Sequence, residues 1–321
     1  MNKRLPWDEM KLPDKDLAVR AVKGSHSLPL YWGKDPFGHC IFVMELEGDH
    51  SESYLKNVVS VRGIRTDLRK IGADDNQGLV ITLEKNVDQD LFSSFCHTLI
   101  LSLEKVIDSA VGLSVALNQI KRWKSFLAGR NSKLLGPEEV RGLFGELLFL
   151  QSMLEKGFTE IDSVGSWCGP EDSHQDFIFS NTSVEIKTLS GKERNTVHIS
   201  SEDQLEGLCD NLFLRIYRLV EKSDSDKALS LNTLVKKIED FLTNSDGRES
   251  FFKKLSEAGY IELQEYDKPK FSLVEERTYR VFGEFPRLIR SRLPEGIIRV
   301  GFEIKLEAIE KFKCNSEEIW G

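Results

Sequence analysis

Hydrophobic and polar positions alternate along two short stretches near the middle of the chain, residues 174–179 and 184–188. A period of two residues predicts β-strands, because successive side chains of a strand point to opposite faces. If Asn181-Thr182 forms a two-residue loop, the two stretches pair as a hairpin. One face of this hairpin is then apolar and carries Phe177, Phe179, Val184 and Ile186.

The other face of the predicted hairpin carries charged groups. The same register places Asp176 opposite Lys187 and Ile178 opposite Glu185. Two converging carboxylates suit Mg²⁺ or Mn²⁺, since a hard cation takes oxygen ligands and keeps waters for substrate phosphates. A neighbouring lysine can orient an attacking water or balance charge on a phosphate. The alternative is an ordinary solvated strand face.

An amphipathic helix is predicted ahead of the hairpin, over residues 137–154. Its apolar residues follow helical spacing: Val140, Leu143, Phe144, Leu147, Leu150 and Leu154. Glu146 lies at the shoulder of this stripe, about 40° from Leu150. Gly142 and Gly145 each cost a helix about 1 kcal/mol relative to alanine, so close packing is expected beside Glu146. Glu146 is a candidate site residue, with a surface carboxylate as the alternative.

The spacing Asp176-x8-Glu185-x-Lys187, in hydrophobic strands and preceded by the helix with Glu146, resembles the PD-(D/E)XK nuclease superfamily. The chain looks most like the prokaryotic PD-(D/E)XK motif proteins of restriction and phage-defence loci. The resemblance is specific over residues 137–205 and looser towards the end. Gln175 stands where the motif has proline, a residue that shapes the backbone and binds no metal.

The resemblance implies an α/β (α+β) fold with a restriction-endonuclease-like core, in which helices flank a central mixed sheet. It also implies Mg²⁺- or Mn²⁺-dependent hydrolysis of DNA by an endonuclease. Asp176 and Glu185 would bind the metal, with the Ile186 carbonyl as a further ligand. Lys187 would orient the attacking water, and Glu146 would bind metal through water or serve a second ion.

Two interpretations are open for each of three candidate residues after the Glu-x-Lys strand: Lys192, Arg194 and Gln204. Ser201 and Gln204 have the S-x-x-Q spacing of a helix capping box. In the resembling superfamily, a glutamine on this helix is often linked with the site, which makes Gln204 a candidate. Lys192 and Arg194 follow the strand directly. They are candidate phosphate contacts or part of a solvated loop.

The pattern predicts three regions: an N-terminal α/β module over residues 1–125, a nuclease-like core over 134–222, and a C-terminal α/β extension over 228–321. The extension is either part of the core or resembles a winged helix. The core is expected to run helix, strand, strand, strand, helix, strand. Strands in the first module are expected at residues 30–32, 39–44, 58–61 and 79–83, and a helix at residues 91–107.

Further elements are predicted in the C-terminal region. Helices are expected at residues 231–242 and 249–258, and Gly259 suits the C-cap of the second. Strands are expected around residues 260–266, 271–274, 279–282 and 297–303.

Composition is that of a globular protein, with 40% hydrophobic and 30% charged residues among 321. No apolar stretch is long enough for a membrane helix, and the N-terminus lacks the apolar core of a secretory signal. Five scattered cysteines form no C-x-x-C pair, which argues against a zinc ribbon or a disulfide framework. We therefore expect a cytoplasmic protein that does not bind membranes.

The net charge of −8 requires that any DNA binding use local basic patches. Three segments qualify, although each is more typical of a solvated face than of a DNA contact: residues 62–70, residues 121–130, and the four arginines Arg287, Arg290, Arg292 and Arg299. An acidic chain of this kind should bind DNA weakly by itself. We expect a partner, a DNA methyltransferase or an ATP-dependent helicase or translocase, with residues 1–125 as the docking surface.

Several alternatives stay open at this point. The chain could be a non-catalytic nucleic-acid-binding or assembly subunit on the same fold. RNA or branched DNA could replace duplex DNA as the substrate, because no base-reading element stands out. The oligomeric state is also undetermined, a homodimer included.

Overall fold

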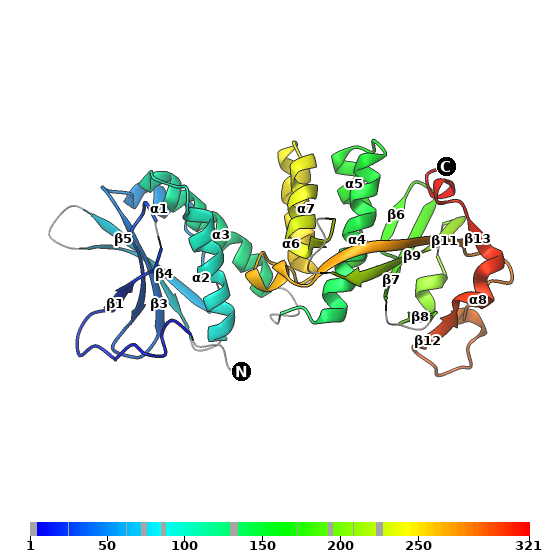
Figure 1. The fold of residues 1–321 in the computed structure, drawn as a ribbon, viewed down its shortest axis with the longest axis horizontal. Coiled ribbons are helices and arrows are strands. Elements are labelled where there is room, and N and C mark those ends of the chain that lie inside the picture. The colour runs from blue at the N-terminus through cyan, green and yellow to red at the C-terminus, as the bar shows by residue number, and fades with distance from the viewer. Residues whose placement is uncertain are drawn as a thin grey trace. The chain divides into compact units, whose positions relative to one another are not determined.

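The computed structural model describes residues 5–24, 26–61, 63–71, 76–84, 88–128, 134–171, 173–191, 195–207, 209–222 and 227–321. The chain divides into two compact units (Figure 1). Unit 1 comprises Met1–Leu134 with Gly259–Glu265, and unit 2 comprises Leu135–Ala258 with Tyr266–Gly321. The domain boundaries expected at residues 125, 134, 222 and 228 stay predictions. Within the described part of the chain, no helix combines the length and the apolarity that a membrane span requires.

Unit 1 contains an antiparallel five-stranded sheet in the order β1-β2-β3-β5-β4. The strands are β1 (Ala18–Ala21), β2 (Leu30–Lys34), β3 (Cys40–Leu46), β4 (Ile64–Lys70) and β5 (Gln77–Leu83). The helices are α1 (Ser51–Asn57), α2 (Gln89–Leu103) and α3 (Ser109–Ala128). Figure 1 shows α2 and α3 on one face of this sheet. Aromatic side chains fill the core between them, including Trp32, Phe42 and Phe92.

Most of the predicted elements of unit 1 are confirmed, and one strand is wrong. β2, β3, β5 and α2 lie where the pattern placed them. Residues 58–61 form no strand. The chain turns at Gly63, where φ is +83°, and β4 follows as the edge strand. Arg65 and Arg69 of the first basic segment lie on one face of β4, beside Asp67.

Unit 2 contains a mixed six-stranded sheet in the order β10-β11-β9-β7-β6, with β13 also paired to β11. Its central pair, β7 and β9, is parallel, and the other pairs are antiparallel. The strands are β6 (Phe177–Phe179), β7 (Thr182–Ser190), β9 (Asn211–Glu221), β10 (Leu229–Ser230), β11 (Lys270–Arg280) and β13 (Lys313–Cys314). A separate ladder joins β8 (Thr196–Ile199) to β12 (Phe302–Lys305).

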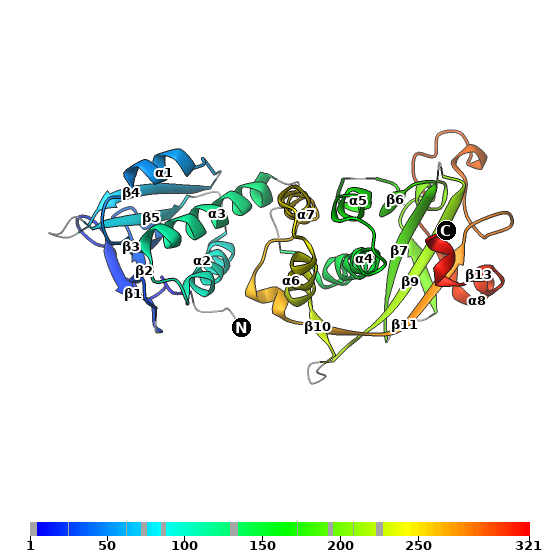
Figure 2. The same ribbon diagram turned by 90° about the horizontal axis from the view of Figure 1, so that it is seen from above.

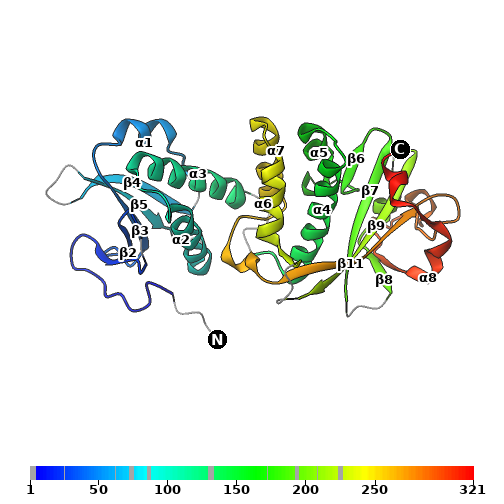
Figure 3. The same ribbon diagram turned by 45° about the horizontal axis from the view of Figure 1, so that its top comes forward.

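Helices and the small ladder cover both faces of this sheet (Figures 2 and 3). On one face lie α4 (Pro137–Glu155) and α5 (Glu160–Ser166), with α6 (Leu231–Phe241) and α7 (Ser245–Glu257) outside them. On the other face lie β8, β12 and α8 (Leu306–Ile309), which share a hydrophobic cluster with β9. β7 is therefore shielded on both faces, which accounts for the burial of a glutamate in its middle.

The predicted stripe of α4 is confirmed, since all six of its apolar side chains are buried. The C-terminal predictions are confirmed in part. Both helices form, and Gly259 follows α7 with φ at +81°. Residues 271–274 and 279–280 belong to one continuous strand, β11, whose register shifts at a bulge between Leu273 and Glu275, and residues 281–282 lie beyond its end. Residues 260–266 and 297–301 form no strand, and β12 begins only at Phe302. A helix-flanked central mixed sheet confirms the predicted α/β (α+β) fold class.

Candidate active site

The hairpin of β6 and β7 forms, but its register differs from the prediction. Phe177 pairs with Val184 and Phe179 pairs with Thr182, so Ser180-Asn181 is the loop rather than Asn181-Thr182. Ser180 takes the left-handed conformation that such a turn requires, with φ at +49°. The register is shifted by two residues. An even shift keeps every side chain on its predicted face.

Asp176 lies immediately beyond the end of this hairpin. The last pair of the hairpin at this end is Phe177 with Val184. The N–H group of Ile186 lies two residues further along β7. The carboxylate of Asp176 accepts a hydrogen bond from that N–H at 2.7 Å. Its backbone carbonyl accepts hydrogen bonds from the N–H groups of Cys168 and Gly169. Asp176 is therefore held from both sides by backbone groups.

Glu146 reaches the same place from α4. Gly145 allows this helix to pack directly on β7, since a Cβ added there would lie 2.3 Å from Cγ2 of Thr188. The predicted close contact is thus present at Gly145, whereas a Cβ at Gly142 would meet nothing within 4 Å. The carboxylate of Glu146 accepts a hydrogen bond from Nε1 of the buried Trp167 at 2.7 Å.

The short turn after α5 brings the carboxylates of Glu146 and Asp176 close together. A Cβ added at Gly169 would lie 2.8 Å from Oε2 of Glu146 and 3.0 Å from Oδ1 of Asp176. These two oxygens are therefore no more than about 6 Å apart. Glycine leaves open the space between them, where any other side chain would intrude.

Lys187 connects the acidic groups to the segment after β8. Its Nζ lies 2.8 Å from Oε1 of the fully buried Glu185 and donates to Oε1 of Gln204 at 3.1 Å. The same oxygen of Gln204 accepts a hydrogen bond from the Ser200 N–H at 2.8 Å. The predicted helix here is a single 3₁₀ turn, η2 (Glu202–Leu205), and Ser201 caps it by accepting from the Asp203 N–H. Gln204 thus joins the backbone of this turn to the lysine.

Burial and like charge shift the pKa values of all these groups. Burial, followed by the charge of Asp176, raises the pKa of Glu146 to about 8. Burial raises the pKa of Asp176 to about 6, although Lys187 and the Ile186 N–H act in the opposite direction. Burial and then Asp176 raise the pKa of Glu185 well above its ordinary range. Burial by itself lowers the pKa of Lys187. The ion pair with Glu185 and the charges of Asp176 and Glu146 have a larger opposite effect, so the pKa of Lys187 is raised overall. If all three carboxyl groups were ionised, the site would carry more negative charge than the single lysine neutralises, and the raised pKa values express the cost of that state.

The cluster opens into a cleft of about 790 Å³. Glu146, Asp176, Glu185, Lys187 and Gln204 all line it, together with Glu138, Arg141, His198 and Glu303. The structure therefore brings all five residues of the predicted catalytic set to one cleft. Ile186 also lines it, on the strand between the two charged residues. The roles assigned to these residues stay predictions.

The donor set suits a hard divalent cation, although the ligands are not gathered into a cage. Among the described residues, no three His, Cys, Asp or Glu side chains form a ready-made metal site. Within the same part of the chain, neither carboxylate oxygen of Glu185 has a hydrogen bond of normal geometry, so its charge is met by the ion pair with Lys187. Buried carboxylate oxygens without hydrogen-bond donors are ready cation ligands. Mg²⁺ suits such a partial set because it keeps several waters.

The predicted phosphate contacts and the three basic segments have separate outcomes. Lys192 and Arg194 lie outside the described residues. Arg65 and Arg69, in unit 1, lie beside Asp67, and part of the segment at residues 121–130 is also outside the described residues. Arg287, Arg290 and Arg299 bind backbone carbonyls and carboxylates of unit 2.

Sequence reasoning missed several residues that position the cluster. Trp167 and Gly169 lie in a turn without a catalytic pattern. Gln175 stands at the motif's proline position, and its buried amide donates to the backbone carbonyl of Asp203 at 2.8 Å. A polar residue directly before Asp176 was the one signal in the sequence that could have suggested such a contact.

Comparison with known proteins identifies one family. A family model described as "Putative PD-(D/E)XK family member, (DUF4420)" matches residues 4–307, nearly the whole chain. No curated protein matches the chain significantly. No solved structure does so either.

Proposed function

The chain belongs to this PD-(D/E)XK-like family, and on that premise we propose that it is a metal-dependent endonuclease that hydrolyses phosphodiester bonds of DNA. One observation carries the proposal. The buried Glu185–Lys187 ion pair faces the cleft that also holds Asp176 and Glu146, and the three carboxylates all have raised pKa values. Such clustering of perturbed acids in a cleft is typical of catalytic sites.

Each residue of the cluster has a distinct role in this proposal. Asp176 and Glu185 hold the divalent cation, with the Ile186 carbonyl beside them. Mg²⁺ or Mn²⁺, when bound, supplies positive charge to the scissile phosphate and lowers the pKa of a water. Lys187 stays protonated, since its pKa is raised, and donates to the attacking water or to the phosphate oxygen that gains charge. Glu146, whose pKa is about 8, holds a proton at neutral pH until a cation or a water draws it away.

The biological setting that we propose is restriction or phage defence. The resemblance of residues 137–205 to motif proteins of such loci supports it. The net charge of −8 supports a dependence on partners, because an acidic chain gains little affinity from phosphates. A DNA methyltransferase or an ATP-dependent helicase or translocase would select the target, with residues 1–125 as the docking surface.

A cleavage assay tests the activity. Supercoiled plasmid is incubated with the purified chain, with and without Mg²⁺ or Mn²⁺, beside Asp176→Asn and Glu138→Gln. We expect metal-dependent nicking that Asp176→Asn abolishes. Glu138→Gln, which removes a carboxylate from the same cleft but outside the cluster, should retain it. Failure to cleave plasmid, single-stranded DNA, branched DNA or RNA, without any metal binding, would favour a non-catalytic subunit.

Partner dependence has its own test. The purified chain should cleave slowly and with little sequence preference. Adding the candidate partner should increase the rate or confine it to particular sites. Robust, sequence-specific cleavage by the chain alone at physiological salt would contradict this part of the proposal.

A further inference from the structure

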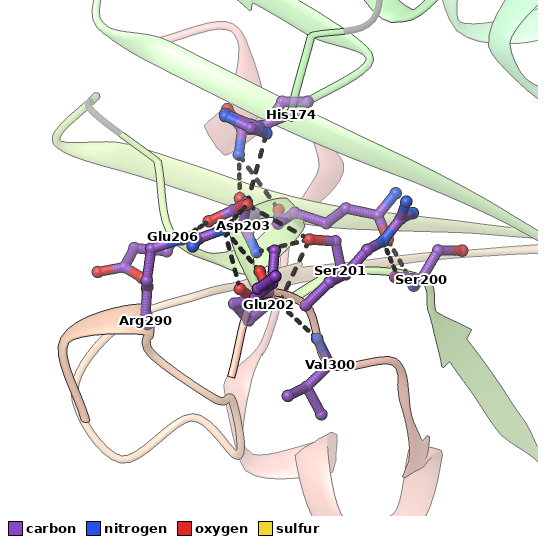
Figure 4. Close-up of polar contacts among 12 residues, drawn as sticks. His174, Ser200, Ser201, Glu202, Asp203, Glu206, Arg290 and Val300 are labelled. Atoms are coloured by element: carbon purple, nitrogen blue, oxygen red, sulfur yellow. Dashed lines mark hydrogen bonds and ion pairs between the residues drawn. The ribbon is translucent and has the colours of Figure 1, made fainter. Parts of the chain in front are cut away.

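Residues 286–300, which we call the arginine loop, lie against the turn η2 that carries Gln204 (Figure 4). Nη1 of Arg287 donates to the Leu205 carbonyl at 2.7 Å, and Nε of Arg299 donates to the Ser200 carbonyl at 3.1 Å. These two contacts satisfy backbone groups at the two ends of η2. The loop therefore holds the whole turn rather than a single residue of it.

Arg290 forms the centre of this contact. Its Nε and Nη2 lie 3.2 and 3.3 Å from the two carboxylate oxygens of Asp203, a forked arrangement that favours arginine. Its Nη2 also lies 3.3 Å from Oε1 of Glu202, and its backbone N–H donates to Oε2 of Glu206 at 2.7 Å. One side chain thus joins two consecutive acidic residues of η2.

Glu202 is the most unusual member of the group, because its side chain has no exposed surface. Oε2 accepts a hydrogen bond from the Val300 N–H at 2.9 Å, while Oε1 faces Arg290. A fully buried carboxylate is costly unless it is paired. Ser201 of the turn donates to Oε2 at 3.4 Å, while the cationic partner and the backbone donor both come from the arginine loop, so the loop and η2 depend on each other.

The turn held in this way is directly connected to the lysine of the cleft. Gln204 accepts hydrogen bonds from Nζ of Lys187 and from the Ser200 N–H, and Ser200 is also the residue that Arg299 contacts. From the other side, the buried amide of Gln175 donates to the carbonyl of Asp203. Gln175, the neighbour of Asp176, therefore contacts the same turn as the arginine loop does.

We propose that the arginine loop is an internal clamp, in which Arg290 acts through Glu202 and Asp203 to position Gln204 and thereby the ammonium group of Lys187. Arg290 and Glu202 are positioning residues that do not touch the substrate. This inference rests on the proposed function for its kinetic consequence. It also assigns these arginines a role different from binding DNA.

The matched pair Arg290→Met and Arg292→Met tests the clamp. Both substitutions remove one positive charge from the arginine loop. Arg292 is exposed, and within the part of the chain that the structure describes its guanidinium group makes no hydrogen bond or ion pair. We expect Arg290→Met to lower kcat about 10- to 100-fold, as loss of a supporting contact typically does. KM for DNA and metal affinity should stay near wild type. Arg292→Met should change kcat less than about twofold by the same reasoning.

A second readout keeps the test independent of activity. The ¹H–¹³Cε NMR signal of Lys187 should shift in Arg290→Met and stay unchanged in Arg292→Met. Glu202→Gln, which keeps an acceptor for the Val300 N–H but removes the charge facing Arg290, should shift the signal in the same direction with less loss of stability. If the wild type shows no nuclease activity, the proposed function fails, while the Lys187 signal still decides the clamp.

Two outcomes would overturn the clamp. Equal increases of KM in Arg290→Met and Arg292→Met, with kcat unchanged, would show that the loop binds DNA. An unchanged Lys187 signal in both Arg290→Met and Glu202→Gln, in protein that melts as a folded domain, would show that the loop does not position the lysine.

Discussion

Replacing Glu146 with glutamine should make the metal-free protein more stable at pH 8 and leave it nearly unchanged at pH 5. Glu146 lies close to Asp176 and is held by Nε1 of Trp167. Glutamine keeps the size of the side chain and a carbonyl oxygen that can still accept from Trp167. The substitution therefore removes the ionisation of Glu146 with little change in packing.

The magnitude follows from the pKa of Glu146, which is about 8 instead of 4.5. The folded protein binds this proton more tightly than the unfolded chain does, so stability is lost as pH rises from 4.5 towards 8. At 1.36 kcal/mol per pKa unit, the loss between pH 5 and pH 8 is at most about 3.5 kcal/mol. The carboxylate is partly open to the cleft, which lowers the expected effect to about 2 kcal/mol. For a unit of this size, that corresponds to about 4 to 8 °C in Tm.

Thermal unfolding in EDTA at pH 5, 6, 7 and 8 measures the effect. Glu146→Gln should melt above the wild type at pH 8, and the difference should shrink steadily towards pH 5. Asp176 and Glu185 titrate in both proteins, so the difference at each pH reports the ionisation of Glu146 together with its interaction with these two carboxylates. Glu138→Gln is the matched control, since Glu138 is an exposed carboxylate on the first turn of the same helix. Its difference from wild type should not vary with pH over this range.

The opposite result would refute the reasoning. If Glu146→Gln and the wild type lose stability in parallel between pH 5 and pH 8, Glu146 ionises without hindrance. The carboxylates would then not crowd one another, and the main electrostatic argument for a cation site would be lost.

Three further predictions concern the same cleft. Glu185→Ala should abolish Mg²⁺ or Mn²⁺ binding in calorimetry, and equal affinities in variant and wild type would contradict its role as a ligand. Lys187→Ala should lower cleavage strongly but leave metal binding nearly intact, because the lysine acts in the transition state; joint loss of metal and activity would mean that it holds the carboxylates in place. Gly169→Ala should weaken metal binding with little loss of stability, since the new methyl group would lie 2.8 Å from the flexible end of Glu146. Gly165→Ala, where a Cβ would meet nothing within 4 Å, is the control, and an equal effect of both on metal affinity would refute the crowding argument.

Much of the local structure near the cleft could be predicted from periodicity alone. The stripe of α4 and the two faces of the β6–β7 hairpin follow from which positions are apolar, because helices and strands repeat every 3.6 and 2 residues. The hairpin shows why such predictions tolerate error. The assumed loop was wrong by one position, yet the resulting shift of two residues kept Asp176 and Glu185 on the same face.

Two predictions from local sequence patterns were wrong, at β4 and at η2. The apolar pattern predicts a strand at residues 58–61, whereas β4 lies at Ile64–Lys70, in the first basic segment. In an edge strand one face can carry such charges, so Arg65 and Arg69 are compatible with a strand. The 3₁₀ turn η2 was expected to be a helix, because Ser201 and Gln204 have the spacing of a capping box. Gln204 instead bonds Lys187 and the Ser200 N–H.

By itself, then, the sequence determined which residues share a face and which type of chemistry their side chains can perform, because both properties are local. Only the tertiary structure decided what supports those residues. Trp167 holds Glu146 across 21 positions, Gln175 reaches η2 across 28, and Arg290 reaches Asp203 across 87. Such contacts depend on how α4, β7 and the β8–β12 ladder are packed around one another. No periodic pattern within a single segment carries that information.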